Sequence, residues 1–187
     1  MPTTPAQRPW RYALTDLTGL LFAALWSMRG LAALGIAPSH GLIITVSISL
    51  PLAWGFLRRD ITHHDPEIVH DHQLARRTRR ARVVLLVAAG MVLSAVHRPD
   101  LMLVVAGLVI GASYLPLGRA MHEPVHIFTG VGILFVTAAS LFLNQPLHSV
   151  VAGLGTASAC WVGALCRLMR SRLIGSPEAE APIRTIA

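Results

Sequence analysis

The sequence predicts an all-α, polytopic membrane protein with six transmembrane helices and both termini in the cytoplasm. Hydrophobic residues make up 53% of the chain and form long runs separated by short polar breaks. Charged residues make up only 13%, about half of what a soluble domain usually carries. A soluble fold could not bury so much apolar surface. A bilayer accommodates it along helices that satisfy their own backbone hydrogen bonds.

The apolar runs divide the chain into three parts. We expect a polar, proline-rich leader at residues 1–9, a six-helix transmembrane domain at 10–170 and a disordered cytoplasmic tail at 171–187. Several of the runs approach the lower limit of roughly 17 residues for a spanning helix. The six spans are expected at about 10–36, 40–57, 81–96, 100–117, 124–143 and 146–169.

Prolines support this division independently of hydropathy. Most stand at or just before the start of an apolar run, where the missing N–H has no helical partner to lose. Asp65 and Pro66 resemble an N-cap followed by a first-turn proline, which predicts that the third helix begins near Pro66. Pro51 and Pro116 fall inside apolar runs and are expected to kink their helices.

The arginines predict the orientation. Every basic residue of the chain is Arg, and the formal net charge is +7. If six spans alternate, nearly all arginines share one side with the termini, and the other side receives Arg98 and an outward-reaching Arg29. This asymmetry predicts that the arginine-rich side is cytoplasmic in the inner (plasma) membrane. Because the arginines stand at the ends of apolar runs, the expected partners are the bilayer and its anionic headgroups, not nucleic acid.

Residues 58–82, called the hub below, form the one long polar stretch. Its histidines and carboxylates are suitable ligands for zinc, iron or manganese. On a helix starting at Pro66, three of them would share one face, and two histidines just before it could fold back to complete a site. The competing interpretation is a solvated helix start with acidic residues near its positive end. The candidate ligands are His63, His64, Glu67, His70 and Asp71.

Five arginines of the hub directly precede the third span. A cluster of this size predicts contacts with anionic lipid headgroups, although the same residues are explained equally well by the orientation signal alone. They are Arg76, Arg77, Arg79, Arg80 and Arg82.

Two ionisable residues fall clearly inside a predicted span. Such residues are costly in lipid and are therefore functional candidates. Asp16 lies near the cytoplasmic end of the first span, at the depth expected for Arg119, so we predict an Asp16–Arg119 pair. Arg29 is expected to pair with Asp100 or to extend towards the outer headgroups. Further polar candidates are Thr45 and Ser49 in the second span, and His122 and Glu123 after the fourth.

The connection between the fourth and fifth spans formally matches the zinc-protease pattern HExxH, at residues 122–126. That pattern needs a continuous helix, whereas Pro124 suits a helix start. His122 and Glu123 are therefore expected to precede the fifth helix, with Glu123 facing its N-terminus. The stretches 50–70 and 115–126 echo each other, which indicates either a duplicated two-helix unit or two unrelated proline-marked helix starts.

The same region carries a resemblance. Leu115-Pro116-Leu117-Gly118-Arg119, followed by His122, Pro124 and Thr129-Gly130, resembles a pattern in uncharacterised bacterial multi-span membrane proteins with a domain of unknown function. The resemblance implies a bacterial inner-membrane protein with a similar number of spans. It implies no activity.

Helix packing is predicted from small residues spaced four apart, which let helices approach closely in lipid. Gly107 and Gly111 form one such pair, and the runs from Gly155 to Gly163 and from Gly19 to Ser27 form two others. Cys160 and Cys166 point to different faces of one helix, so no disulfide is expected.

Three functions remain open from the sequence. The first is a small transporter or channel-like protein, which would need to form a homo-oligomer to enclose a path. The second is a metal-dependent membrane enzyme that uses the hub and the loop at His122. The third is a non-catalytic protein that binds lipid or a partner through the arginine cluster.

Overall fold

The computed structural model describes residues 10–62, 69–98 and 101–174, with side chains for 16–59, 69–98 and 101–170. The described residues are all-helical and contain no strand. They form six long helices, as expected from the apolar runs. The last one is continuous through a short α-helix, a π-helical segment and a longer α-helix. The elements are α1 (Trp10–Ala33), α2 (Pro38–Thr62), α3 (His72–Ala95), α4 (Met102–Met121), α5 (Pro124–Ser140), α6 (Leu147–Val150), η2 (Val151–Gly155) and α7 (Thr156–Ile174).

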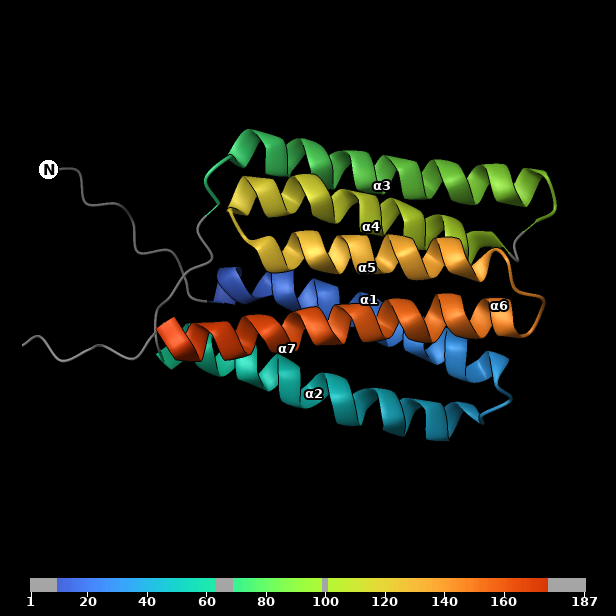
Figure 1. The fold of residues 1–187 in the computed structure, drawn as a ribbon, viewed down its shortest axis with the longest axis horizontal. Coiled ribbons are helices and arrows are strands. Elements are labelled where there is room, and N and C mark those ends of the chain that lie inside the picture. The colour runs from blue at the N-terminus through green and yellow to red at the C-terminus, as the bar shows by residue number, and fades with distance from the viewer. Residues whose placement is uncertain (1–9, 63–68, 99–100, 175–187) are drawn as a thin grey trace, which may run out of the picture.

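The helices run up and down in a bundle, so that their ends gather at two opposite ends of the molecule (Figure 1). The start of α1, the end of α2, the start of α3, the end of α4 and the end of α7 share one end. In the bundle, α3 packs chiefly on α4, α4 on α5, and α5 on α7. Helix α1 packs on α2 and on α7. The two outer helices, α2 and α3, therefore lie on opposite sides of the bundle.

Three of the helical stretches are long and apolar enough to cross a membrane: Pro38–Arg59, Met102–Met121 and Leu147–Arg170. The outer surface is apolar as well. Phe128, Phe135 and Phe142 of the α5 region are 74%, 72% and 89% exposed, and Met91 of α3 is 68% exposed. Soluble monomers rarely expose apolar surface on this scale, which indicates a membrane protein.

Small residues bring the helices together, as predicted. A Cβ added at Gly107 or Gly111 of α4 would meet α5 side chains at 2.8 and 3.0 Å. A Cβ at Gly163 of α7 would meet the Thr129 hydroxyl of α5. The sequence analysis missed a further contact, in which the backbones of Gly30 in α1 and Gly153 in η2 lie so close that a Cβ on either would clash.

The start of the third helix differs from the prediction. Helix α3 begins at His72 and not near Pro66. Its N-cap is Asp71, whose carboxylate accepts hydrogen bonds from the backbone N–H groups of Gln73 and Leu74 at 3.0 and 2.8 Å. Asp65 and Pro66 lie outside the described residues. The proline was a weaker guide here than the carboxylate, because Asp71 satisfies two of the free N–H groups at the helix start.

Candidate functional site

Among the described side chains, Asp16 in α1 is the one carboxylate that is buried. The residue is 5% exposed. Arg167 of α7 donates to both of its carboxylate oxygens, and Arg59 of α2 donates to Oδ2 at 3.3 Å. The Arg167 contact is a two-pronged guanidinium–carboxylate fork, the strongest geometry for this kind of pair. One carboxylate thus joins three helices that are far apart in sequence.

An aromatic ring completes the cluster. Phe56 of α2 is fully buried, and the guanidinium carbons of Arg59 and Arg167 lie 5.1 and 5.7 Å from its ring centroid. A cation near the face of an aromatic ring is attracted by the ring quadrupole. Among the described side chains, two guanidinium groups thus share one carboxylate in a region of low dielectric.

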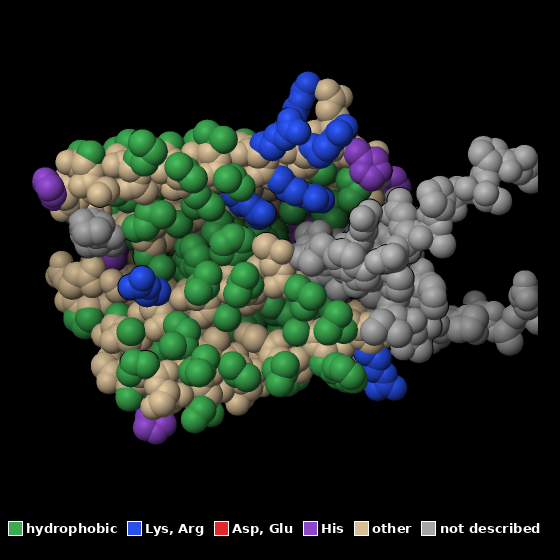
Figure 2. Space-filling model, turned by 180° about the vertical axis from the view of Figure 1, so that it is seen from behind, with side chains coloured by type: hydrophobic (Ala, Val, Ile, Leu, Met, Phe, Trp, Pro, Cys, Tyr) green, Lys and Arg blue, Asp and Glu red, His purple; other side chains and the backbone are tan. Residues whose placement is uncertain are grey.

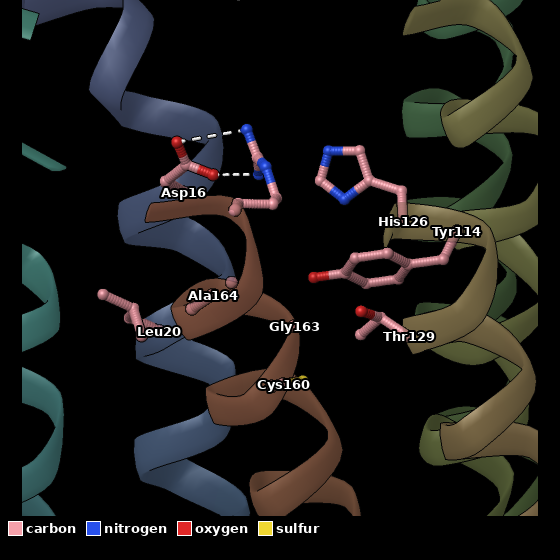
Figure 3. A pocket seen from close by; sticks show the side chains of 10 residues that line it. Asp16, Leu20, Tyr114, His126, Thr129, Cys160, Gly163 and Ala164 are labelled. Carbon is pink, nitrogen blue, oxygen red and sulfur yellow. Dashed lines mark hydrogen bonds and ion pairs between the residues drawn. The ribbon is translucent and has the colours of Figure 1, made fainter. Parts of the chain in front are cut away.

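A small cavity adjoins Asp16 and Arg167. Its volume is about 20 Å³, which is room for about one water molecule. Figure 3 shows Tyr114 of α4 and His126 and Thr129 of α5 projecting towards α7, across from Asp16. The Tyr114 and His126 rings meet edge to face, with centroids 5.6 Å apart. Most of the described residues that line this cavity carry a polar or sulfur-bearing group. The exceptions are Leu20, Ala164 and the two glycines Gly19 and Gly163.

A larger cavity of about 120 Å³ lies beside the first and shares Gly19, Tyr114 and His126 with it. Its other walls are Thr18 and Phe22 of α1, Leu117 of α4, and Arg79 and Arg82 of α3. No carboxylate is among the described residues that line it. The two cavities together extend from the outer side of α1 and α3 to the charge cluster inside the bundle.

The predicted Asp16–Arg119 pair is not formed. Asp16 is held by Arg59 and Arg167, and Arg119 is exposed. All three arginines lie near the same end of the bundle, so depth alone did not distinguish them. The face of each helix decides the partner: Arg119 points outward from α4. Arg29 is exposed at the opposite end of α1, and its proposed partner Asp100 lies outside the described residues.

Thr45 and Ser49 hold helices together. The Thr45 and Ser27 hydroxyls lie 2.9 Å apart and join α2 to α1. The Ser49 hydroxyl accepts a hydrogen bond of 3.1 Å from the indole N–H of Trp161 in α7. Both residues thus satisfy polar groups between helices, and neither lines the two cavities described above.

The described end of the hub before α3 lies against the loop at His122. The backbone N–H groups of His70 and Asp71 donate to the carbonyl of Ala120 at 2.9 and 3.0 Å. The rings of His70 and His122 meet edge to face with centroids 4.3 Å apart. As expected, α5 begins at Pro124, so the HExxH pattern does not lie on one continuous helix. Glu123 occupies the N-cap position of α5 but makes no capping hydrogen bond with its side chain, which forms an ion pair of 2.9 Å with Arg170 of α7.

The candidate metal ligands are only partly described. His63, His64 and Glu67 lie outside the described residues. The expectation that His70 and Asp71 share a helix face with Glu67 is wrong, because both precede α3. Among the residues that are described, no group of three or more His, Cys, Asp or Glu side chains is placed to hold a metal ion. Metal binding by the full set stays a prediction.

The sequence analysis missed most of the site. It used Arg59 and Arg167 only to orient the helices, and it gave no role to Tyr114, His126 or Phe56. A signal for the arginines was present, because both end apolar runs at the depth of Asp16. No comparable signal marked the aromatic residues, which come from apolar segments and meet Asp16 only through the packing of α4, α5 and α7.

Comparison with protein-family models, with curated proteins and with solved structures gives no match to this chain. The geometry of the site therefore carries the functional argument alone.

Proposed function

We propose that this protein is a six-span protein of the bacterial inner membrane that moves a small charged solute, with Asp16, Arg59 and Arg167 as its charge-handling site. The observation that carries the proposal is the burial of Asp16 with two arginines where α1, α2 and α7 converge. Ionisable residues inside a membrane-spanning bundle are expensive and usually mark the path of an ion or a solute.

The distribution of arginines between the two ends of the bundle in Figure 1 supports the proposed orientation. The end that contains Thr62, His72, Met121 and Ile174 also receives most of the described arginines, and the opposite end receives Arg29 and Arg98. Under the positive-inside rule, the arginine-rich end is cytoplasmic. Both termini, the hub and the charge cluster then lie towards the cytoplasm.

The two guanidinium groups of the cluster favour an anion as the solute. An anion that enters the adjoining cavities is attracted to the two guanidinium groups and competes for them with Asp16. The competition defines two states of the site, one with the carboxylate on the arginines and one with the anion there. A shift of α1 or α7 between such states is a known way to open a binding site to alternate sides of a membrane.

Flux through reconstituted liposomes tests the proposal. Purified protein is placed in liposomes that contain a pH-sensitive or a chloride-sensitive dye, and proton and chloride fluxes are followed under an imposed gradient. Wild-type protein should raise at least one flux above that of protein-free liposomes. Arg59→Gln should lower it by about tenfold, the equivalent of one charge-assisted hydrogen bond.

Arg58→Gln is the matched control, because Arg58 is the neighbouring residue, carries the same charge and is exposed. Its flux should equal that of the wild type. The proposal would be overturned if the wild-type proton and chloride fluxes both equal those of protein-free liposomes. If the Arg58 and Arg59 variants lose equal amounts of flux, the cluster has no specific role in the movement of the solute.

A further inference from the structure

The five arginines of the hub fall into two groups in the structure. Arg76, Arg77 and Arg80 are exposed and line neither of the cavities described above. Arg79, which is exposed as well, and Arg82, which is partly buried, line the cavity of about 120 Å³ between α1 and α3. Figure 2 shows arginine side chains gathered towards one end of α3, beside a hollow in this face of the molecule. The sequence treated the five as one cluster, and the structure separates them by helix face.

The helical period explains the separation. Ala75, Arg79, Arg82 and Leu86 follow one another at spacings of three or four, which places them on one stripe of α3. The two ends of the stripe pack into the bundle: Ala75 is 2% exposed and Leu86 packs against the main core. Of the two arginines between them, Arg82 is partly buried and Arg79 is exposed, and both line the cavity. The positive-inside rule explains why positive charge lies near this end of α3, but it does not explain why two of the arginines line a cavity.

Arg82 reaches across the gap to α1. It is partly buried, and its guanidinium carbon lies 5.6 Å from the ring centroid of Phe22. Tyr114 and His126 add a hydroxyl and an imidazole to the cavity walls, and Thr18 adds a second hydroxyl. No ion pair in the described part of the chain involves Arg79 or Arg82. The described walls of the cavity thus present two guanidinium groups and further polar groups, with no carboxylate among them.

This chemistry matches one kind of ligand. Guanidinium groups bind phosphate oxygens through paired N–H donors. A volume of about 120 Å³ is several times that of a water molecule, which is enough for one phosphate group. Arg82 directly precedes the apolar part of α3, which starts at Val83. In the proposed orientation, the cavity therefore opens at the depth of the cytoplasmic headgroups.

We infer that the cavity between α1 and α3 is a binding site for a phosphate-bearing anion, held by Arg79 and Arg82, whose source is either a lipid headgroup or a phosphate dissolved in the cytoplasm. The inference rests on the membrane placement of the proposed function and not on the movement of a solute.

Binding to delipidated protein in detergent tests the site. Lipid adducts are counted by native mass spectrometry during titration with phosphatidic acid, with phosphatidylcholine as the neutral comparison. Inorganic phosphate is titrated separately by calorimetry. The test variant is Arg79→Gln with Arg82→Gln. The control is Arg76→Gln with Arg80→Gln, which removes the same charge from positions of the same helix that do not line this cavity.

The test variant should bind the active ligand about 30-fold more weakly, as expected for two arginines near a headgroup. The control should change binding by less than about twofold. Phosphatidic acid binding that free phosphate does not reproduce identifies a lipid headgroup, and binding of inorganic phosphate with the same dependence on the two arginines identifies a dissolved anion. Both results support the site.

Equal losses in the two double variants would overturn the inference, because they would indicate attraction to a general positive surface. Absence of binding by both phosphatidic acid and inorganic phosphate to the wild type would overturn it as well. The melting temperature of each variant is measured alongside, so that a loss of fold is not read as a loss of binding. Because no flux is measured here, the site and the proposed transport succeed or fail separately.

Discussion

At the scale of single residues, Asp16 has the greatest effect on this protein. Its carboxylate is the one negative group in contact with both Arg59 and Arg167 in the described structure. Removing one partner of a buried ion pair usually costs about 3–5 kcal/mol, because a buried charge loses its compensation. Removing a surplus arginine costs less, since the carboxylate keeps the other one. Comparing the stability lost in the two cases therefore distinguishes a shared carboxylate from two independent ion pairs.

We therefore expect Asp16→Asn to lower the melting temperature more than Arg167→Gln does. The double variant should lose less than the sum of the two single variants, because the partners are coupled. Unfolding is followed with a thiol-reactive dye in a Cys166→Ser background, where the buried Cys160 reports the loss of structure. An Arg167→Gln variant as unstable as Asp16→Asn, with additive losses in the double variant, would contradict the shared carboxylate.

At the scale of helices, the contact between α5 and α7 depends on the absence of a side chain at Gly163. A Cβ there would clash with the hydroxyl of Thr129 and would come within 3.2 Å of its Cβ. The Thr129 hydroxyl is fixed by its hydrogen bond of 2.8 Å to the Val125 carbonyl, so it cannot easily turn away. The same two helices carry Thr129, His126 and Arg167, which line the cavity next to Asp16.

Gly163→Ala should therefore destabilise the protein by about 1–3 kcal/mol, as overpacking usually does. Gly132→Ala in α5 is the control, since its Cβ would meet Ala159 at an ordinary 3.7 Å. Adding Thr129→Ala to Gly163→Ala should restore part of the loss. The dye assay in the Cys166→Ser background measures all three variants. Equal melting temperatures for the Gly163 and Gly132 variants would show that the helices separate at no cost.

At the scale of the whole molecule, the up-and-down bundle and its two unequal ends predict how the chain lies in the membrane. The bundle places Gln73 at the arginine-rich end and Asn144 at the opposite end, and both side chains are exposed. In the proposed orientation, Gln73 faces the cytoplasm and Asn144 faces the other compartment.

Cysteine labelling checks this orientation. In a background with Cys160→Ala and Cys166→Ala, Gln73→Cys should react with a membrane-impermeant maleimide only in inside-out vesicles. Asn144→Cys should react only in right-side-out vesicles. The reverse pattern would show that the orientation is the opposite of the proposed one. Labelling of both positions from the same side would contradict three membrane crossings by α3, α4 and α5.

The helices were predictable because their signals lie along the chain itself. Long apolar runs and prolines gave six helices close to their observed positions, and α5 begins at Pro124 as expected. Small residues at spacings of four predicted close packing, because that spacing falls on one helix face. The start of α3 was misplaced because two Asp residues, Asp65 and Asp71, each precede a plausible first turn, and local sequence does not rank them.

The site needed three-dimensional information. That Asp16 should have a cationic partner followed from its position in an apolar helix, since an uncompensated charge is costly there. Which arginine serves depends on how α1, α2 and α7 rotate against one another, and those rotations are set by contacts such as Gly30 with Gly153. The same holds for the hub, whose arginines are identical in sequence terms and differ only in the face of α3 that they occupy.

The sequence by itself determined that the chain is helical, apolar on its outside and asymmetric in positive charge, because these properties depend on composition and on spacing along the chain. Tertiary structure alone decided that Asp16 pairs with Arg59 and Arg167, and that Arg79 and Arg82 face a cavity while their neighbours do not. The physical reason is that a charge is placed along a helix by sequence, whereas its partner is chosen by the packing of helices that are distant in the chain.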